Sequence, residues 1–486
     1  MEKYIKTIGS ILFLLIILTS CNNDWLDETS STQISSDEQF KTEEGFKDAL
    51  IGVYIGMTSP NLYSRDMTYN IVDLLSQQYV ALPNLAQYNE VQKFEYRTTK
   101  STNQIDALWI KSYNVIANIN LALEYIDRNK NVLNAIDYSI IKGELLALRV
   151  FIHLDIMRLY GYGNLAEREN LKSKYTIPYV TKFGKDLTTQ LSYIETFNLM
   201  ENDLNEALQL LEEDPVFATN KPANYYLEVN RNGFYNNREQ RMNYYAAKAL
   251  QARLFQWQGK YEQAAIAAQT VINNSFTSLI NPASYPIESD PILYPEILFS
   301  LDVEGFADIV NRFLTADDSG TNYDALYYTQ TQMNEIFEAS NVNIGLTDIR
   351  YNTLLDTQTK GLVSLKLLQD GNDYLNQMPL MKLTEMYYIV AEYNLDVNPV
   401  IAVQYLNTVR EHRGILETIP ETVTIEELEK ELMKEYRKEF LSEGQLFFFY
   451  KRTGTSKILG LSDTFELNDD IYVLPYPDNE LEFGNR

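Results

Sequence analysis

The stretch "RMNYYAAKALQARLFQWQGKYEQAAIAAQTVINN", residues 241–274, predicts two helices that pack against each other. The first helix is expected to run to Trp257, after which Gly259 turns the chain and an alanine-rich helix returns. We expect a positive φ at Gly259, because glycine adopts that conformation without a steric penalty. Small side chains on both helices allow a close approach: Ala246, Ala249, Ala264 and Ala268.

Further helices with the same character precede and follow this pair. The string Gly-x-Tyr-x-x-Ala at 259–264 resembles part of a tetratricopeptide repeat. Helix starts are expected at Thr42 and at three capping-box patterns, which are Ser101 with Gln104, Ser192 with Glu195, and Thr424 with Glu427. The apolar stretch 143–163 predicts a central buried helix, in which His153 is expected to be a hydrogen-bonded core residue. The pattern therefore predicts a mainly all-α fold of about four stacked helix pairs.

The segment 275–380 interrupts this helical pattern. It contains turn signals and aromatic residues with little periodicity, apart from "EILFSLD" at 296–302, which predicts a short strand. Long irregular segments of this kind are usually functional or mobile. No shift of composition divides the chain, so we expect one domain over 42–486 with a loop-rich insertion around 275–380.

The N-terminus has the features of a lipoprotein leader. Lys3 and Lys6 precede the short apolar run 11–19, which predicts a signal peptide over residues 1–20. Leu18-Thr19-Ser20-Cys21 resembles a bacterial lipobox, and Cys21 is the one cysteine of the chain. We expect lipidation of Cys21 and a polar tether over 21–41. An uncleaved anchor or a buried cysteine are the alternatives.

Charge and composition exclude several classes of function. With 41 basic and 67 acidic residues the formal charge is -26, which disfavours nucleic acid as a partner. The acidic residues are spread along the chain, which predicts a solvated exterior. With Cys21 acylated there is no thiol for catalysis or metal binding, and His153 and His412 are far apart in sequence. We expect no metal and no cofactor, and we interpret the acidic stretch 317–324 as a solvated loop.

The order of several segments along the chain resembles the SusD/RagB family of outer-membrane nutrient-binding lipoproteins. The resemblance covers nearly the whole mature chain and depends on the combination of these strings: "WLD" at 25–27, "LWIKSYNVIANIN" at 108–120, "GELLALRVFIHLDIMRLYG" at 143–161, "IPYV" at 177–180, the stretch 241–264, "PEILFSLD" at 295–302, "TDIRYN" at 347–352, "LNTVREHRG" at 406–414 and "YRKEFLSEG" at 436–444. One departure is that Leu446 and Phe449 stand where the family typically has Arg and Asp.

The resemblance implies both a fold and a role. The fold would have four tetratricopeptide-like pairs that support irregular ligand-binding loops. The protein would be anchored to the outer membrane by its lipid, exposed at the cell surface, and would deliver an oligosaccharide, or in some members a peptide, to a SusC-like TonB-dependent transporter.

Two loop regions contain the residue types that carbohydrate binding requires, which are aromatic rings for sugar faces and amides or carboxylates for hydroxyls. They correspond to the two regions through which members of the family bind. The predicted ligand-binding residues are Tyr88 in "LAQYNEVQ" and Asn322, Tyr323, Tyr327 and Tyr328 in "TNYDALYYTQTQ". Tyr327 and Tyr328 are adjacent, so on extended backbone their side chains point in opposite directions. The alternative is that each tyrosine packs locally.

A glycoside hydrolase is the main alternative among enzymes. It requires two carboxylates on either side of a cleft, and no spacing among the acidic residues singles out such a pair. The chain also lacks the Gly-x-Ser-x-Gly string of serine hydrolases and a glycine-rich phosphate loop. We therefore expect a binding protein without catalytic residues. A scaffold that binds only other polypeptides is a third interpretation.

Overall fold

The computed structural model describes residues 35–484, with the exception of 218–219, 223, 316–320 and 463. The predicted signal peptide, Cys21 and most of the predicted tether lie outside the described residues. In the part that is described, no helix combines the length and the apolar composition that a membrane span requires.

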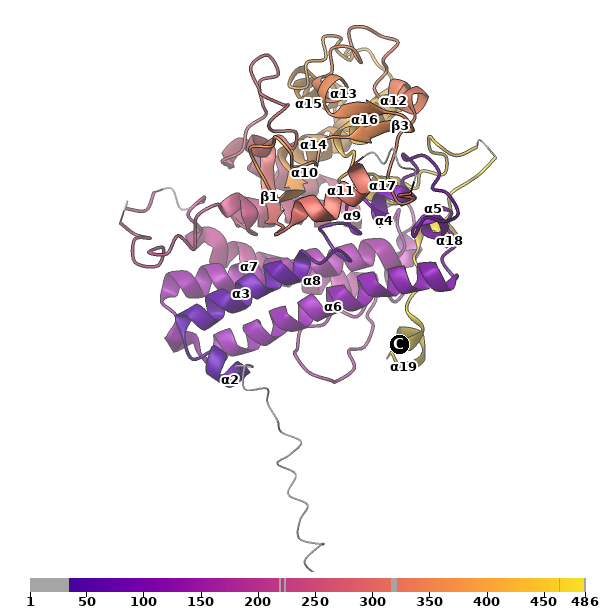
Figure 1. The fold of residues 1–486 in the computed structure, drawn as a ribbon. Coiled ribbons are helices and arrows are strands. Elements are labelled where there is room, and N and C mark those ends of the chain that lie inside the picture. The colour runs from indigo at the N-terminus through magenta and orange to yellow at the C-terminus, as the bar shows by residue number, and fades with distance from the viewer. Residues whose placement is uncertain (1–34, 218–219, 223, 316–320, 463, 485–486) are drawn as a thin grey trace, which may run out of the picture.

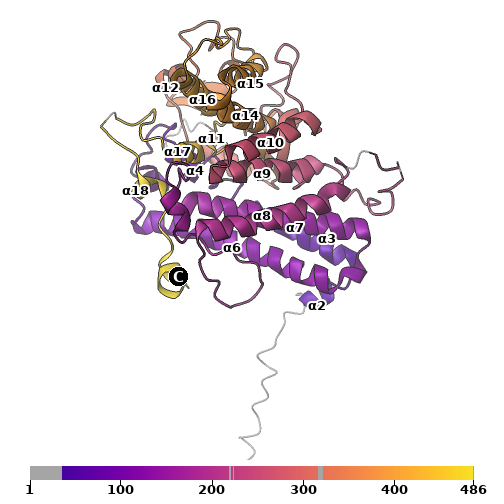
Figure 2. The same cartoon turned by 180° about the vertical axis from the view of Figure 1, so that it is seen from behind.

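Four long helices form the lower half of the molecule in Figures 1 and 2. They follow the short α2 (Ser36–Gln39) and are α3 (Glu43–Met57), α6 (Thr99–Arg128), α7 (Ala135–Tyr160) and α8 (Tyr193–Leu210). The predicted caps Thr42 and Ser192 are confirmed, since each side chain accepts a hydrogen bond from the backbone N–H three residues later. The predicted start at Ser101 is wrong, because Thr98 caps α6 and accepts from the Ser101 N–H at 3.2 Å.

The helical hairpin predicted at 241–274 is confirmed. Its helices are α9 (Tyr244–Gln258) and α10 (Tyr261–Asn274), and Gly259 between them has a φ of 80°. The helix α10 packs against α14 (Leu383–Val397), which packs in turn against α15 (Pro399–Glu411) and α16 (Ile425–Glu439). The capping box of Thr424 and Glu427 is present at the start of α16. These helices form the upper half of the molecule together with the insertion (Figure 1).

The insertion contains more regular structure than the sequence predicts. The predicted strand is confirmed as β1 (Ile297–Asp302), and it pairs antiparallel with β4 (Gln377–Lys382). The strand β4 runs to Lys382, because β1 supplies a hydrogen-bonding partner that local periodicity does not reveal. The other elements of the insertion are α11 (Phe306–Leu314), α12 (Gln330–Ile336), α13 (Ile349–Thr353) and the hairpin of β2 (Leu355–Gln358) and β3 (Gly361–Ser364).

Several short elements complete the chain. Two of them lie in the segment between α3 and α6, namely α4 (Ile71–Leu75) and α5 (Asn89–Gln92). Three follow α16, namely α17 (Leu446–Thr453), α18 (Asp469–Tyr472) and α19 (Asp478–Phe483).

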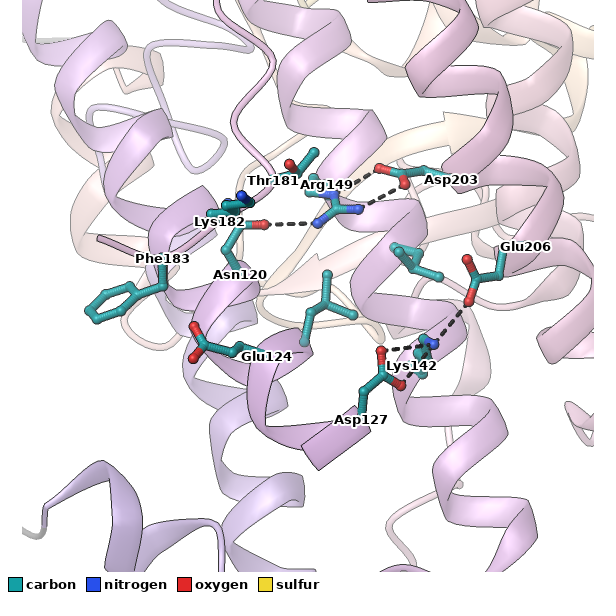
Figure 3. Close-up of a pocket in the computed structure, with 12 residues that line it drawn as sticks. Asn120, Glu124, Asp127, Lys142, Arg149, Thr181, Lys182, Phe183, Asp203 and Glu206 are labelled. Atoms are coloured by element: carbon teal, nitrogen blue, oxygen red, sulfur yellow. Dashed lines mark hydrogen bonds and ion pairs between the residues drawn. The ribbon is translucent and has the colours of Figure 1, made fainter. Parts of the chain in front are cut away.

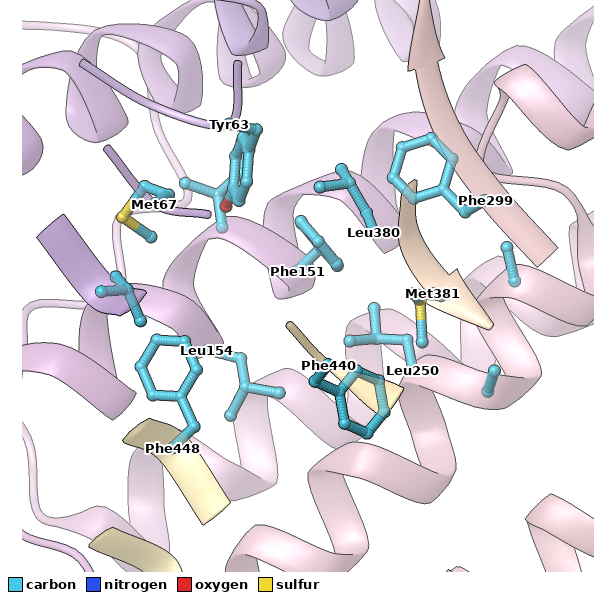
Figure 4. Close-up of a cluster of buried hydrophobic side chains, with 14 of the residues drawn as sticks. Tyr63, Met67, Phe151, Leu154, Leu250, Phe299, Leu380, Met381, Phe440 and Phe448 are labelled. Carbon is cyan, nitrogen blue, oxygen red and sulfur yellow. The ribbon is translucent and has the colours of Figure 1, made fainter. Parts of the chain in front are cut away.

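The β1–β4 pair and the helices share one hydrophobic core that runs from Phe40 to Leu474. Figure 4 shows its centre, where Phe299 of β1 and Met381 of β4 lie close to Phe151 of α7 and Leu250 of α9. The apolar segment 446–450 is buried in the same core. The mainly helical fold predicted from the sequence is confirmed.

His153 is a core residue, as predicted, with no exposed surface. Its Nδ1 lies 2.8 Å from the carbonyl oxygen of Arg149, and its Nε2 accepts a hydrogen bond from the Val180 N–H at 3.0 Å. The ring therefore joins α7 to the loop that precedes α8.

Candidate ligand-binding site

The two loop regions singled out in the sequence lie against each other in the structure. The Val80 N–H donates to the carbonyl oxygen of Tyr327 at 2.7 Å, and the Gln87 N–H donates to Oδ1 of Asp324 at 2.6 Å. Arg312 at the end of α11 forms an ion pair of 2.6 Å with the other carboxylate oxygen of Asp324. Segments more than 200 residues apart in sequence are thus joined into one surface.

The exposed ring faces expected at Tyr88 and Tyr328 are not present. Tyr88 is 1% exposed and packs edge-on against Phe313 of α11, with ring centroids 5.9 Å apart. Tyr328 has no exposed surface and stacks on Tyr79 at 4.7 Å. The rings of Tyr88 and Tyr328 hold the two loop regions together and have no free face for a sugar ring.

Tyr327 and Tyr328 point in opposite directions, as expected for adjacent residues of an extended backbone. Tyr328 forms an antiparallel bridge with Leu362 of β3, which keeps this segment extended. Tyr328 faces the main core, whereas Tyr327 packs with Ala325 and Val363 and is 8% exposed. Neither ring is exposed in the structure, since the β2–β3 hairpin covers Tyr327, and the role of the two tyrosines in ligand binding stays a prediction.

Asn322 and Tyr323 lie at the surface of the same region. Asn322 Nδ2 donates to the carbonyl oxygen of Arg312 at 2.5 Å, and its Oδ1 accepts from the Asp324 N–H at 3.1 Å. The amide therefore shapes the turn that places Tyr323, whose side chain is 43% exposed. Their role in ligand binding stays a prediction.

A pocket of about 350 Å³ lies where the first loop region meets the start of α12 and the segment after α17. Its lining comes from Gln77, Tyr79, Val80, Ala81, Thr329, Thr331, Gln332, Glu335, Leu459 and Gly460. Gln332 Nε2 donates to the carbonyl oxygen of Gln77 at 3.2 Å and so fixes one side of the pocket to the other. We call this cavity the α12 pocket.

Positive φ angles at Gln77 and Gly460 allow the two segments that contain them to approach each other closely at the α12 pocket. Gln77 has a φ of 61°, and its side-chain amide holds that conformation by donating to the carbonyl oxygens of Leu74 and Gln92 at 3.0 and 2.7 Å. Gly460 has a φ of 95°, and a Cβ there would lie 2.3 Å from the carbonyl oxygen of Gln77. Only glycine fits at this position.

The α12 pocket offers polar groups that are free to bind a ligand. Thr331 and Glu335 are exposed, and within the described part of the chain their side chains form no hydrogen bond or ion pair. Hydroxyl, amide and carboxylate groups around a partly apolar floor suit a ligand with many hydroxyl groups. Glu335 is the one carboxylate of the described residues that line the pocket.

A buried polar cluster supports the floor of the pocket. The Tyr79 hydroxyl donates to Oδ2 of Asp73 at 3.3 Å and lies 3.4 Å from the Ser442 hydroxyl. The Gly444 N–H donates to the other carboxylate oxygen of Asp73 at 3.1 Å. Burial raises the pKa of Asp73 to about 7, although hydrogen bonds from the backbone N–H groups of Gly444 and Ser442 lower it in part. These contacts fix the position of Tyr79.

Another pocket, of about 490 Å³, lies on the helices α6, α7 and α8 and is shown in Figure 3. Its charged groups point toward one another. Arg149 binds both carboxylate oxygens of Asp203, and Lys142 lies 2.9 Å from Asp127 and from Glu206. These charged groups neutralise each other in pairs, whereas Thr181 and Lys182 of the same lining are exposed.

Metal binding has no candidate site in the described residues, which include no cluster of three or more His, Cys, Asp and Glu side chains suited to an ion. The residues that line the α12 pocket were not predicted from the sequence. The string "TQTQ" at 329–332 was visible as a polar run beside the tyrosines. The contribution of Leu459 and Gly460 had no comparable signal, since they are more than 120 residues further along the chain.

Two family models match the sequence. One is described as "Starch-binding associating with outer membrane" and matches residues 24–227, and a model of the SusD family matches residues 352–469. No curated protein matches the chain.

Solved structures from Bacteroides share the fold at low sequence identity. A SusD superfamily protein from Bacteroides thetaiotaomicron is 20% identical with a TM-score of 0.70, over 91% of this chain and 98% of the other. A SusD-like carbohydrate binding protein from Bacteroides vulgatus is 19% identical, with a TM-score of 0.69 over 91% and 96%. The surface glycan-binding protein A from Bacteroides thetaiotaomicron, solved with laminarihexaose, is 15% identical with a TM-score of 0.67 over 91% and 97%.

Proposed function

Since the chain belongs to the SusD/RagB family, we propose that it is a carbohydrate-binding protein of the outer membrane that holds an oligosaccharide in the α12 pocket. The observation that carries this proposal is the pocket itself. It lies at the junction of the two loop regions, and Thr331 and Glu335 leave polar groups free for sugar hydroxyls.

The family comparisons support this class of ligand. One matching family model is described as starch-binding, and a relative with the same fold was solved with a bound glucan hexasaccharide. Tyr323 and Leu85 are exposed apolar side chains of the same two loop regions, and they would extend the contact area beyond the pocket.

Binding without catalysis agrees with the chemistry of the pocket. A glycosidase holds its substrate between two carboxylates, about 5–5.5 Å apart in retaining enzymes and about 6.5–9.5 Å apart in inverting ones. Glu335 has no second carboxylate beside it among the described lining residues. We therefore propose that bound sugar leaves the pocket unchanged.

The remaining parts of the proposal concern location and partner. A lipid on Cys21 would anchor the protein to the outer membrane at the cell surface. A SusC-like TonB-dependent transporter would receive the oligosaccharide. This part of the proposal comes from the family resemblance, and its test is co-purification of the two proteins from membranes.

The binding site can be tested by isothermal titration calorimetry of the purified protein with a panel of soluble oligosaccharides. The variant Thr331→Val/Glu335→Gln removes a hydroxyl and a charge from the pocket, and we expect at least tenfold weaker binding, since one hydrogen bond to a charged group contributes about 1.5–3 kcal/mol. Glu429→Gln on the exposed face of α16 is the matched control.

Three results would contradict the proposal in different ways. Equal affinity of the pocket variant and the parent would exclude the α12 pocket as the site. Binding of peptides and of no sugar would replace the ligand class with the alternative. Release of shortened sugars during incubation would identify a hydrolase.

A further inference from the structure

A further pocket, with aromatic walls, lies beside α5 and α18. Like the α12 pocket, it is lined by the connection between α3 and α6 and by the segment after α17. Its volume is about 510 Å³. The lining includes four aromatic rings and three charged side chains: Phe94, Tyr96, Arg97, Tyr162, Asp469, Asp470 and Tyr476. We call it the C-terminal pocket, because residues 469–481 form one of its sides.

The walls of the C-terminal pocket are fixed from behind. The Tyr96 hydroxyl donates to the carbonyl oxygen of Ile471 at 2.7 Å, and Tyr476 packs edge-on against Trp109 of α6, with centroids 5.4 Å apart. The Leu474 N–H donates to the carbonyl oxygen of Leu159 in α7 at 3.1 Å. A pocket held in this way loses little conformational entropy when a ligand binds.

Phe94 is held in a strained conformation at the edge of this pocket. Its φ is 63°, in the left-handed region, which is rare for a bulky residue. Its ring stacks on Phe465, with centroids 5.8 Å apart and an interplanar angle of 22°. Phe465 is itself 38% exposed. The two stacked rings therefore lie at the surface beside the pocket.

The charged groups of the C-terminal pocket balance each other. Arg168 forms a two-pronged ion pair with Asp469, at 2.9 Å from Nη1 to Oδ2 and 3.1 Å from Nη2 to Oδ1. Arg97 and Asp470 are exposed, and no ion pair engages either of them within the described part of the chain. Their formal charges cancel, so the pocket presents donors and acceptors without a net charge. This combination fits a neutral sugar, whose apolar face packs on rings and whose hydroxyls bind guanidinium and carboxylate groups.

The two pockets have no lining residue in common, but both are lined by the connection between α3 and α6 and by the segment after α17, which suits one extended ligand. Gln77 and Tyr79 line the α12 pocket, and Phe94, Tyr96 and Arg97 of the same connection line the C-terminal pocket. Gly460 lines the first pocket, and Phe465 stacks on a ring that lines the second. Since Gly460 and Phe465 are five residues apart, their Cα atoms are at most about 18 Å apart.

We propose that the C-terminal pocket is a second subsite for a neutral oligosaccharide, and that one chain of several sugar units occupies both pockets. The proposal rests on the proposed function, since it assumes that the α12 pocket binds sugar. Occupation of the second pocket by the same molecule is intramolecular, so affinity should increase with the length of the oligosaccharide.

The test compares disaccharides with hexasaccharides of the malto-, cello-, laminari- and xylo- series by isothermal titration calorimetry. We expect at least one hexasaccharide to bind tenfold or more tightly than its disaccharide. Arg97→Ala and Tyr162→Ala should each reduce the affinity for the hexasaccharide by a several-fold larger factor than the affinity for the disaccharide. Arg97 is exposed, so its variant is expected to fold normally. The matched control for loss of an exposed ring is Phe276→Ala, after α10.

The outcomes separate the two proposals. Equal hexasaccharide affinity of the parent and both variants would overturn the second subsite and leave the proposed function intact. Loss of disaccharide and hexasaccharide binding in equal proportion would also overturn it, because the residues would then belong to a single site. If no member of the four series bound to the parent, neutral oligosaccharide would be excluded as the ligand of both pockets.

Discussion

The geometry around His153 predicts that its imidazole stays neutral well below the pH at which a free histidine is protonated. Nε2 accepts the Val180 N–H, so this nitrogen carries no proton, and Nδ1–H must donate to the carbonyl oxygen of Arg149. A second ring proton would face the Val180 N–H and displace it. Burial lowers the pKa of His153 to about 3, with a further decrease from the charge of Arg149, although the hydrogen bond to the Arg149 carbonyl raises it in part.

The effect on stability follows from the difference between the folded and unfolded states. Between about pH 6.5 and pH 3 the unfolded chain binds a proton at this residue and the folded protein does not, so the free energy of unfolding decreases as the pH falls. Each pH unit contributes about 1.4 kcal/mol, so a change from pH 6.5 to pH 5 should cost about 2 kcal/mol. Above pH 6.5 the contribution is fully present.

Urea unfolding at a series of pH values, followed by circular dichroism, measures this loss. The variant His153→Gln can keep both hydrogen bonds without a titrating group, so its loss of stability between pH 6.5 and pH 5 should be smaller by about 2 kcal/mol. His412→Gln, which removes the other histidine of the chain, is the control and should retain the full loss. A His153 ring that takes up a proton near pH 6.5 in NMR spectra of the folded protein would refute the reasoning.

Three further predictions concern the fold, the anchor and the loop tyrosines. Gly259→Val should destabilise the protein by about 1–2 kcal/mol, because valine is strained in the left-handed backbone conformation. The new Cβ would also lie 2.9 Å from the Cβ of Ala166, which adds to the destabilisation. An unchanged melting temperature would contradict this prediction. Cys21→Ala should abolish labelling with fatty acid and release the protein from membranes, whereas equal labelling would exclude a lipid anchor at that residue. Tyr88→Ala should cost about 3–5 kcal/mol, as large aromatic truncations in a core do, while Tyr323→Ala should change stability by less than about 0.5 kcal/mol. Equal melting temperatures of these two variants would contradict the burial of Tyr88.

Helices could be predicted from the sequence where apolar periodicity and a cap agree. At Ser192 and Thr424 the capping residue directly precedes an amphipathic stripe, and both helices begin there. At Ser101 the same pattern occurs one turn inside a helix, because Thr98 offers a hydroxyl three residues earlier. A short capping motif alone does not distinguish these cases.

The candidate site was predictable as a region but not as a set of side chains. Loss of helical periodicity indicated the two loop regions, and the structure places them together. Which tyrosines are exposed depends on pairings across long sequence distances, such as the bridge of Tyr328 to Leu362 and the stack of Tyr328 on Tyr79. No local pattern distinguishes these rings from Tyr323.

The buried charged residues could not be predicted from the sequence. The even spread of acidic residues predicts a solvated exterior, yet Glu439 of α16 is buried and receives charged donors from α13, from β4 and from the loop after α15. Arg413 binds it at 3.0 Å, Arg350 of α13 at 2.9 Å and Lys382 of β4 at 2.7 Å. Arg413 also binds Glu296, 117 residues away, at 2.6 Å. Removal of one partner from such a buried network typically costs about 3–5 kcal/mol, because a charge is left without compensation.

The same kind of contact positions the wall of the α12 pocket. Glu338 follows α12, has a φ of 57°, and lies 2.8 Å from both Lys434 and Lys438 of α16. Lys438 in turn is buried and contacts Glu435, which binds Arg350 of α13. The insertion is therefore tied to the helical body by ion pairs in addition to apolar packing. Because ion pairs have defined donor and acceptor directions, they fix the orientation of α12, and with it the positions of Thr331 and Glu335, more narrowly than apolar contacts alone would.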